Sequence, residues 1–505
     1  MKTKRSMQIF LAMILVASAI LACNQFAGTP TVTPEPTLTE IAPTAESTEP
    51  VEEPLDPDAG SSGMGDSLYP EFGNGGYNVT HYTLDITVND VPTSNLTAIT
   101  TVEAKATQDL VSFNLDFIGF EITNITINEQ PAGFERDGQE LTITPSELIT
   151  ENKSFTVVVE YNGSPSEFQS MAIPVQTGWV TFEGGSFVLS EPDGAATFYP
   201  VNDHPLDKAS FTFRVTVPKP FEVAANGVLT ETVDNGDTTT FLFEAHDPMA
   251  SYLATINIDE FNIETEQSPS GIPIRNYYAT GLPKGVNEPF ARQGEMLEYF
   301  GELFGPYPFE VYGSLVLDTY FGAALENQTM SIYGMDMIDL DDIEGTELVV
   351  AHELSHQWFG DSVSVADWSD IWLNEGFADY SEGLWIEHTQ GREALDAWVK
   401  SDYTTVVDFP EYFPPPGNPP ADNLFNGGVY VRGGLTLHAL RIEVGDEVFF
   451  DILKTYAKRY KYGNATTDDF IAVAEEVSGK ELTEFFDGWL NDEKMPSIPE
   501  LGLGE

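Results

Sequence analysis

Residues 352–380 read HELSHQWFGDSVSVADWSDIWLNEGFADY and predict two consecutive helices. His352 and His356 are four residues apart, so both side chains project from one face of a helix. Two imidazoles placed in this way can bind one Zn²⁺ ion. Glu353 lies roughly 100° around the same helix, beside the metal, a position that suits a general base acting on water. The alternative is a pair of surface histidines on an ordinary helix.

A third ligand is expected from Glu375, which follows His356 after 18 intervening residues. A catalytic zinc needs three protein ligands and an open fourth position, whereas structural zinc usually has sulfur ligands. The chain has 1 cysteine, so His352, His356 and Glu375 predict one catalytic zinc per chain. Asp379 and Glu382 can share the helix face of Glu375, and either can accept a hydrogen bond from a metal histidine. The alternative for both is a solvated carboxylate.

The composition of the whole chain limits its class and its partners. It has 505 residues, of which 41% are hydrophobic and 12% aromatic, which indicates a globular protein with two or three domains. The chain has 22 Lys+Arg and 81 Asp+Glu, a net charge of −59. This charge argues against nucleic acid and against an anionic lipid surface as partners. We attribute the acidity to solubility; adaptation to a salty environment is the alternative.

The N-terminus has the pattern of a processing signal. Basic residues precede an apolar run at positions 9–22, which is too short for a comfortable membrane span. The run ends in Ile-Leu-Ala-Cys, which resembles the lipobox of bacterial lipoproteins. The resemblance implies that a signal peptide, residues 1–22, is removed and that Cys23 is lipidated. We therefore expect an extracytoplasmic protein anchored to a bacterial membrane, at the cell surface or at the periplasmic face.

Three further segments are expected after the signal peptide. Residues 23–66 are rich in Thr, Pro, Glu and Ser and predict a disordered tether. Residues 67–264 contain period-two stretches such as HYTLDITV and SFTFRVTV, and VDNGDT is a hairpin turn, which together predict an antiparallel β domain. Residues 265–505 show apolar spacings near 3.6 and are expected to be mostly helical. The predicted fold class is α+β multidomain.

The stretches HELSHQWFG and WLNEGFADY, with their 18-residue spacing, resemble the M1 family of zinc aminopeptidases, which are gluzincins. The resemblance implies that residues 265–505 form a thermolysin-like zinc metallopeptidase domain, a small mixed sheet plus helices. Many family members continue into a long helical C-terminal domain. This sequence ends shortly after FFDGWLNDEKMP, so we expect a short two-domain form without that C-terminal domain.

Two glutamates are assigned to the substrate's amino group through this resemblance. AALEN at 323–327 matches the family's G-A-M-E-N motif with two departures, and Glu326 falls on the glutamate that binds the free α-amino group. A buried ammonium must be paired with carboxylates. A glutamate held one residue-length from the zinc therefore places the bond after the first amino acid of the substrate at the metal. In VLSEPDG, Glu191 falls on the second acidic residue, while Leu189 replaces a glutamine. His204 replaces the glutamate of a D-E-P corner.

The tyrosine of the family's Y-x-K-G motif falls on Tyr430, within YVRG, where Arg432 replaces the lysine. In the family this tyrosine stabilises the oxyanion, and one such hydrogen-bond donor is typically worth about 10²–10³ in rate. A packing tyrosine is the alternative.

The expected function is a zinc-dependent aminopeptidase that removes N-terminal residues from peptides with a free N-terminus. Two alternatives remain at this point. The altered AALEN stretch is compatible with an endopeptidase of the same zinc chemistry. A catalytically inactive cell-surface binding protein is also possible, although a binding module has no need of a base beside the metal.

Overall fold

The structure is a computed structural model that describes residues 59–173 and 175–504. The expected signal peptide, Cys23 and most of the expected tether lie outside the described residues. Residues from Gly60 onward form one compact unit. In the described part of the chain, no helix combines the length and the apolar character that crossing a membrane requires.

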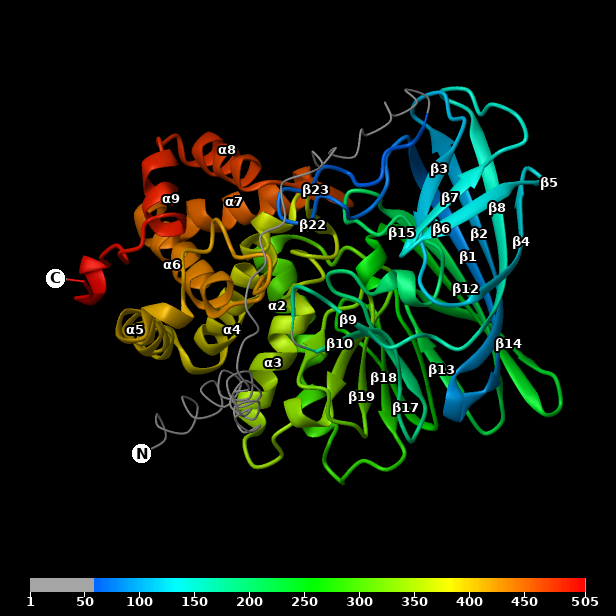
Figure 1. The fold of residues 1–505 in the computed structure, drawn as a ribbon. Helices are drawn as coiled ribbons and strands as arrows, with labels where there is room; N and C mark the ends of the chain where they lie inside the picture. Colours follow the sequence, from blue (N-terminus) through cyan, green and yellow to red (C-terminus); the bar gives the residue numbers. More distant parts are fainter. Residues whose placement is uncertain (1–58, 174, 505) are drawn as a thin grey trace, which may run out of the picture. The chain divides into compact units, whose positions relative to one another are not determined.

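An eight-stranded sheet follows from the period-two stretches, because alternate side chains are buried along its long strands (Figure 1). Its neighbours are antiparallel except for β1 and β12, which are parallel. The mostly antiparallel β domain predicted from the sequence is therefore confirmed. In spatial order the strands are β14 (Val228–Asp234), β15 (Thr238–Met249), β12 (Ala209–Pro218), β1 (Tyr77–Asp90), β2 (Asn95–Ala106), β8 (Ser154–Gly163), β4 (Glu121–Ile127) and β5 (Gln130–Pro131).

Two smaller sheets complete the β-rich region. The predicted hairpin joins β14 to β15, and Gly236 in its turn has φ +92°, a conformation that favours glycine. One small sheet has the order β13 (Glu222–Ala225), β16 (Ile256–Asp259), β11 (Ser186–Leu189), β10 (Gln176–Thr181) and β9 (Phe168–Gln169). The other has the order β3 (Phe113–Asp116), β7 (Glu140–Thr144) and β6 (Gly133–Asp137).

The small mixed sheet expected for the catalytic domain is present. Its order is β17 (Phe261–Gln267), β18 (Pro273–Ala279), β19 (Tyr312–Leu317), β21 (Ser331–Gly334) and β20 (Ala324–Leu325). The three central strands are parallel and the two outer strands are antiparallel to their neighbours. The boundary expected between residues 264 and 265 lies inside β17, because β17 pairs with β18 along its whole length.

Helices make up most of the remaining chain and gather apart from the large sheet in Figure 1. They are α2 (Gln293–Phe304), α3 (Ile343–Ser355), α4 (Trp372–Gln390), α5 (Arg392–Asp408), α6 (Gly433–Val444), α7 (Asp446–Arg459), α8 (Thr467–Ser478) and α9 (Thr483–Leu490). Helix α5 buries one narrow stripe and ends in a β-branched stretch, Thr404–Val407, which weakens its helical signal. The pair β22 (Val363–Val365) and β23 (Gly463–Ala465) is parallel.

Residues 60–66, which we expected to belong to the tether, are part of the folded unit. Asp66 explains why, because its Oδ1 accepts hydrogen bonds from Leu68 N and Tyr69 N at 2.9 and 2.8 Å. Its Oδ2 accepts from Trp368 N at 2.8 Å and lies 3.2 Å from Nε2 of His204. His204, which replaces the glutamate of the D-E-P corner, therefore has a buried acidic partner, Asp66.

Asp203, the first residue of that corner, and Asp207, just after the corner, should make stability depend on pH. Burial raises the pKa of each carboxyl to about 7, well above about 3.9 in an unfolded chain. A raised folded-state pKa gives stability that is complete below about pH 4 and is lost as the pH rises through about 7. We expect the free energy of unfolding to fall by roughly 2–3 kcal/mol per carboxyl between pH 5 and pH 8.5.

Urea unfolding of the wild type and of Asp207→Asn at both pH values measures this effect. Between these pH values the free energy of unfolding of the variant should fall by roughly 2–3 kcal/mol less than that of the wild type, because one titrating carboxyl is absent. Equal losses in the two proteins would show that Asp207 is already ionised in the folded state at pH 5.

Candidate active site

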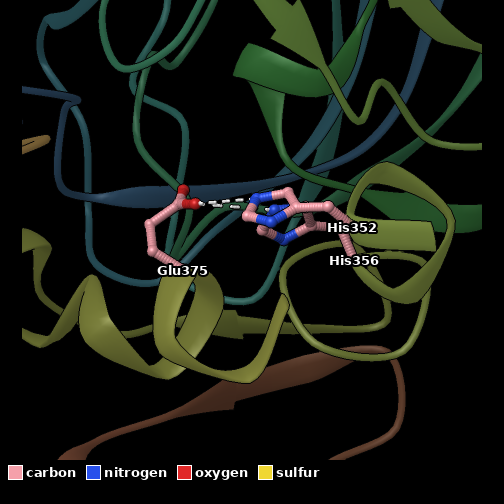
Figure 2. A group of neighbouring side chains, drawn as sticks. All are labelled: His352, His356 and Glu375. Atoms are coloured by element: carbon pink, nitrogen blue, oxygen red, sulfur yellow. Dashed lines mark ion pairs between the residues drawn. The ribbon is translucent and has the colours of Figure 1, made fainter. Parts of the chain in front are cut away.

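The three expected metal ligands converge from two neighbouring helices (Figure 2). His352 lies in α3, His356 caps its C-terminal end, and Glu375 lies in the first turn of α4. Nε2 of His352 and Nε2 of His356 lie 3.5 and 3.6 Å from Oε2 of Glu375. Ligand atoms bound to zinc at about 2.0–2.1 Å in a tetrahedron lie roughly 3.3 Å apart, so these residues fit one zinc ion.

Each metal histidine is oriented by its second ring nitrogen. Nδ1 of His352 lies 2.9 Å from Oε1 of Glu382, and Nδ1 of His356 lies 3.0 Å from the carbonyl oxygen of Phe359. These hydrogen bonds leave both Nε2 atoms directed at Glu375, the arrangement that metal histidines usually have. Of the two carboxylates proposed for this role, the structure therefore selects Glu382.

Asp379 does not orient a metal histidine, which corrects that expectation. Among the described residues its Oδ2 has no hydrogen-bond partner. A Cβ atom added to Gly434 in α6 would lie 2.2 Å from this oxygen, so the carboxylate faces α6 rather than α3. Burial, together with the nearby Glu382 and Asp402, raises the pKa of Asp379 well above its usual range.

The charges of the ligand set favour an ionised carboxylate. Burial opposes ionisation of Glu375, but the charge of His356 and hydrogen bonds from both histidines lower its pKa to about 2. The pKa of His356 is raised to about 8, because the attraction of Glu326 and Glu375 outweighs the effect of burial. An ionised carboxylate is the form that binds a metal.

Glu353 lies beside the metal ligands and is 6% exposed. Burial raises the pKa of Glu353 to about 8, although His352 and His356 act in the opposite direction. Its carboxylate, that of Glu326 and a ring nitrogen of His356 all lie within 4.8 Å of one another. This is the position expected of a base that serves the metal site and the substrate together.

The two glutamates assigned to the substrate amine are both buried, Glu326 after β20 and Glu191 after β11. Burial and the charge of Glu326 raise the pKa of Glu191 well above its usual range, and Oε1 of Glu191 has no hydrogen-bond partner among the described residues. Two such carboxylates favour a cation between them. Leu189 and Leu325, where the motifs depart from the family, belong to a buried apolar cluster.

Tyr430 lies in a π-helical turn, η8 (Gly428–Arg432), that precedes α6. Its ring centre is 6.0 Å from that of His352, with the ring planes 24° apart. Burial and the charges of Glu375 and Glu191 raise the pKa of its phenol well above the usual range, so the hydroxyl keeps its proton. Arg432 donates from Nε to the carbonyl of Trp489 at 2.8 Å, which ties this turn to α9.

Four residues near the site were not identified from the sequence. The hydroxyl of Tyr252 donates to Oε1 of Glu326 at 3.4 Å, and Gln357 contacts the backbone of the same glutamate. Nζ of Lys208 donates to the carbonyls of Asp361 and Ser362 at 2.8 and 3.1 Å. Gln357 and Asp361 adjoin the HELSH motif and could have been suspected there. Tyr252 and Lys208 come from the β-rich region, where no spacing marks them.

Comparisons with known proteins agree with this geometry. Residues 289–489 match the model of the peptidase family M1 domain, and residues 78–253 match that of the peptidase M1 N-terminal domain. The crystal structure of an M1 zinc metallopeptidase from Deinococcus radiodurans is 31% identical, with a TM-score of 0.78, covering 86% of this chain and 99% of that chain.

Curated relatives are similar over part of their length. Human glutamyl aminopeptidase is 29% identical over 62% of this chain and 34% of its own length. A probable aminopeptidase 2 of Sulfurisphaera tokodaii is 26% identical over 76% of this chain and 50% of its own length. The chain thus spans about a third of the length of the glutamyl aminopeptidases that it matches.

A mixed sheet followed by helices that present two histidines, a glutamate ligand and an adjacent glutamate defines a gluzincin-type zinc metallopeptidase. The β-rich region before it matches the N-terminal domain that accompanies this catalytic domain. The chain belongs to peptidase family M1, and it is similar to a structure described as a two-domain M1 zinc metallopeptidase, which is 31% identical with a TM-score of 0.80.

Proposed function

We propose that the protein is an aminopeptidase that hydrolyses the N-terminal peptide bond of peptides. The observation that carries the proposal is the position of Glu326, whose carboxylate lies within 4.8 Å of a ring nitrogen of His356 and of the carboxylate of Glu353. A substrate ammonium paired with Glu326 and Glu191 would place the first peptide bond beside the metal ligands. Relatives named aminopeptidases, and a Deinococcus relative whose structure holds a Tyr-Ser-Ala substrate, support this proposal.

Each residue of the site has a defined part in this reaction. His352, His356 and Glu375 hold one zinc ion, which when bound polarises the scissile carbonyl and activates water. Glu353 takes a proton from the attacking water and delivers it to the leaving amine. The phenol of Tyr430 donates a hydrogen bond to the oxyanion. Glu382 keeps His352 in the orientation that binds the metal.

The test compares leucine 4-nitroanilide with its N-acetylated form, using wild type and Glu326→Gln. We expect the wild type to hydrolyse only the free amine. We expect Glu326→Gln to lose about 10²-fold in kcat/KM, because a charge-assisted hydrogen bond to the ammonium is lost inside a buried site. Hydrolysis of both substrates by the wild type would instead indicate an endopeptidase. No zinc-dependent hydrolysis across a panel of free-amine substrates would favour the binding-protein alternative.

We also propose that the protein is exported and anchored to a bacterial membrane by a lipid on Cys23. The support is the basic and apolar N-terminal pattern and the resemblance of its end to a lipobox. Radiolabelled palmitate incorporation in cells expressing the full chain, compared with Cys23→Ala, measures lipidation. Equal labelling of the two proteins would rule out Cys23 as the attachment site.

A further inference from the structure

Hydrogen bonds from the side chain of Gln357 connect the loop that carries Glu326 to the metal-binding segment. Nε2 of Gln357 donates to the carbonyl oxygen of Glu326 at 2.8 Å, and its Oε1 accepts from the backbone N–H of Thr329 at 2.8 Å. Gln357 follows the ligand His356 directly and is fully buried. The side-chain amide of Gln357 therefore binds the loop at two points, Glu326 and Thr329, while its backbone is joined to the metal ligand His356.

The backbone of this loop needs such support. Thr329 has φ +67°, a left-handed conformation that non-glycine residues adopt only at some cost. Its N–H is held by Gln357, and its Oγ1 accepts from Gly227 N at 2.8 Å. A conformation of this kind persists where the surroundings determine it. The shape of the turn after Glu326 thus depends on contacts outside the loop.

The β-rich region holds the same loop from another direction. Nδ2 of Asn226 donates to the carbonyl of Gln328 at 2.8 Å, and Nδ2 of Asn327 donates to the carbonyl of Leu253 at 3.1 Å. These contacts fix the loop relative to the β-rich region but do not connect it to the metal ligands. Gln357 makes that connection, so it couples the position of Glu326 to the position of His356.

We propose that Gln357 is a positioning residue that sets the distance between Glu326 and the metal ligands, and thereby the requirement for a free substrate amine. This inference rests on the proposed aminopeptidase function. A displacement of about 1 Å in a site of this kind can cost about 10²-fold in rate. Loss of the Gln357 hydrogen bonds should therefore weaken recognition of the amine without removing the metal.

The test uses two variants of Gln357. Gln357→Leu has a similar volume and removes the hydrogen bonds to Glu326 and Thr329, together with the one that Oε1 accepts from the Tyr307 hydroxyl at 3.3 Å. Gln357→Glu keeps an acceptor for Thr329 N but sets an oxygen against the Glu326 carbonyl. Two competitive inhibitors separate the effects. The amine 3-methylbutylamine reports binding at Glu326, and acetohydroxamic acid reports binding at the metal. We expect the inhibition constant of the amine, and KM for leucine 4-nitroanilide, to rise about tenfold or more in both variants. The inhibition constant of the hydroxamate and the zinc content should stay within about twofold of wild type.

Trp358→Phe is the matched control, because it removes one buried hydrogen bond at the next position, from Nε1 to the carbonyl of Gly305 at 2.9 Å. It should lower Tm without changing the ratio of the two inhibition constants. A zinc-loaded Gln357→Leu or Gln357→Glu protein that binds both inhibitors as wild type does, or loses both equally, would overturn the inference. If Gln357→Leu does not fold, Gln357→Glu decides the question. A wild type that hydrolyses the N-acetylated substrate equally well would instead remove the proposed function itself.

Discussion

Replacing Glu353 with glutamine is expected to lower kcat/KM for leucine 4-nitroanilide by about 10²–10⁴-fold while leaving zinc content unchanged. Glutamine has the same shape but cannot accept a proton. The side chain is buried, so bulk water cannot readily take over the proton transfer. Glu353 lies beside the ligand set rather than between the two histidines and Glu375, so its loss should spare the metal. Steady-state kinetics and atomic emission on the same preparations measure the two quantities.

Glu302→Gln is a suitable control for this experiment, since Glu302 is an exposed glutamate on α2 and the charge change is the same. It should retain wild-type kinetics. If Glu353→Gln kept more than about a tenth of wild-type activity, Glu353 would not be the general base. If the variant instead lost its zinc, Glu353 would have to be treated as a metal ligand.

Replacing Glu375 with alanine is expected to weaken zinc binding by more than about 100-fold, which is beyond the effect of losing an outer-shell partner. Two neutral imidazoles would then remain without the carboxylate that balances the charge of the metal. Treatment with 1,10-phenanthroline should abolish activity in the wild type, and stoichiometric zinc should restore it. The same addition should not restore Glu375→Ala. Competition with a fluorescent zinc chelator measures the affinity.

Glu382→Gln is the comparison variant for the zinc-affinity assay, with a smaller expected loss than Glu375→Ala. Its carboxylate contacts Nδ1 of His352 but not the metal position, so its loss should weaken zinc binding by about 10–100-fold. A Glu375→Ala protein that bound zinc as tightly as Glu382→Gln would show that Glu375 is not a ligand.

Much of the site could be predicted because its information is local. A spacing of four residues places His352 and His356 on one face of any helix, and the apolar periodicity around them predicts that helix. Glu375 could be added because a catalytic zinc needs a third ligand. The large sheet was predictable for a similar reason. In strands such as β1 every second residue is buried, and the sequence shows this as hydrophobic residues at alternate positions.

Other features could not be predicted because they depend on how elements pack. Asp379 and Glu382 share a helix and a spacing argument, and only the packing of α4 against α3 and α6 shows that Glu382 meets His352. The boundary expected after residue 264 falls inside β17, because a strand belongs to the sheet with which it pairs, and pairing is not a local property. The buried partner of His204, Asp66, lay in a segment whose composition resembles a tether.

The sequence by itself determined which residues are candidate metal ligands, the glutamate beside them, the secondary structure that presents them and the general order of the β-rich and catalytic regions. Periodicity and short spacings are sufficient for these features, since each depends on residues that are near in the chain. The tertiary structure alone decided how Tyr252, Gln357 and Lys208 surround the site and how far Glu326 lies from the metal ligands. These are contacts between residues far apart in sequence, and such contacts form only when the sheets and helices pack together.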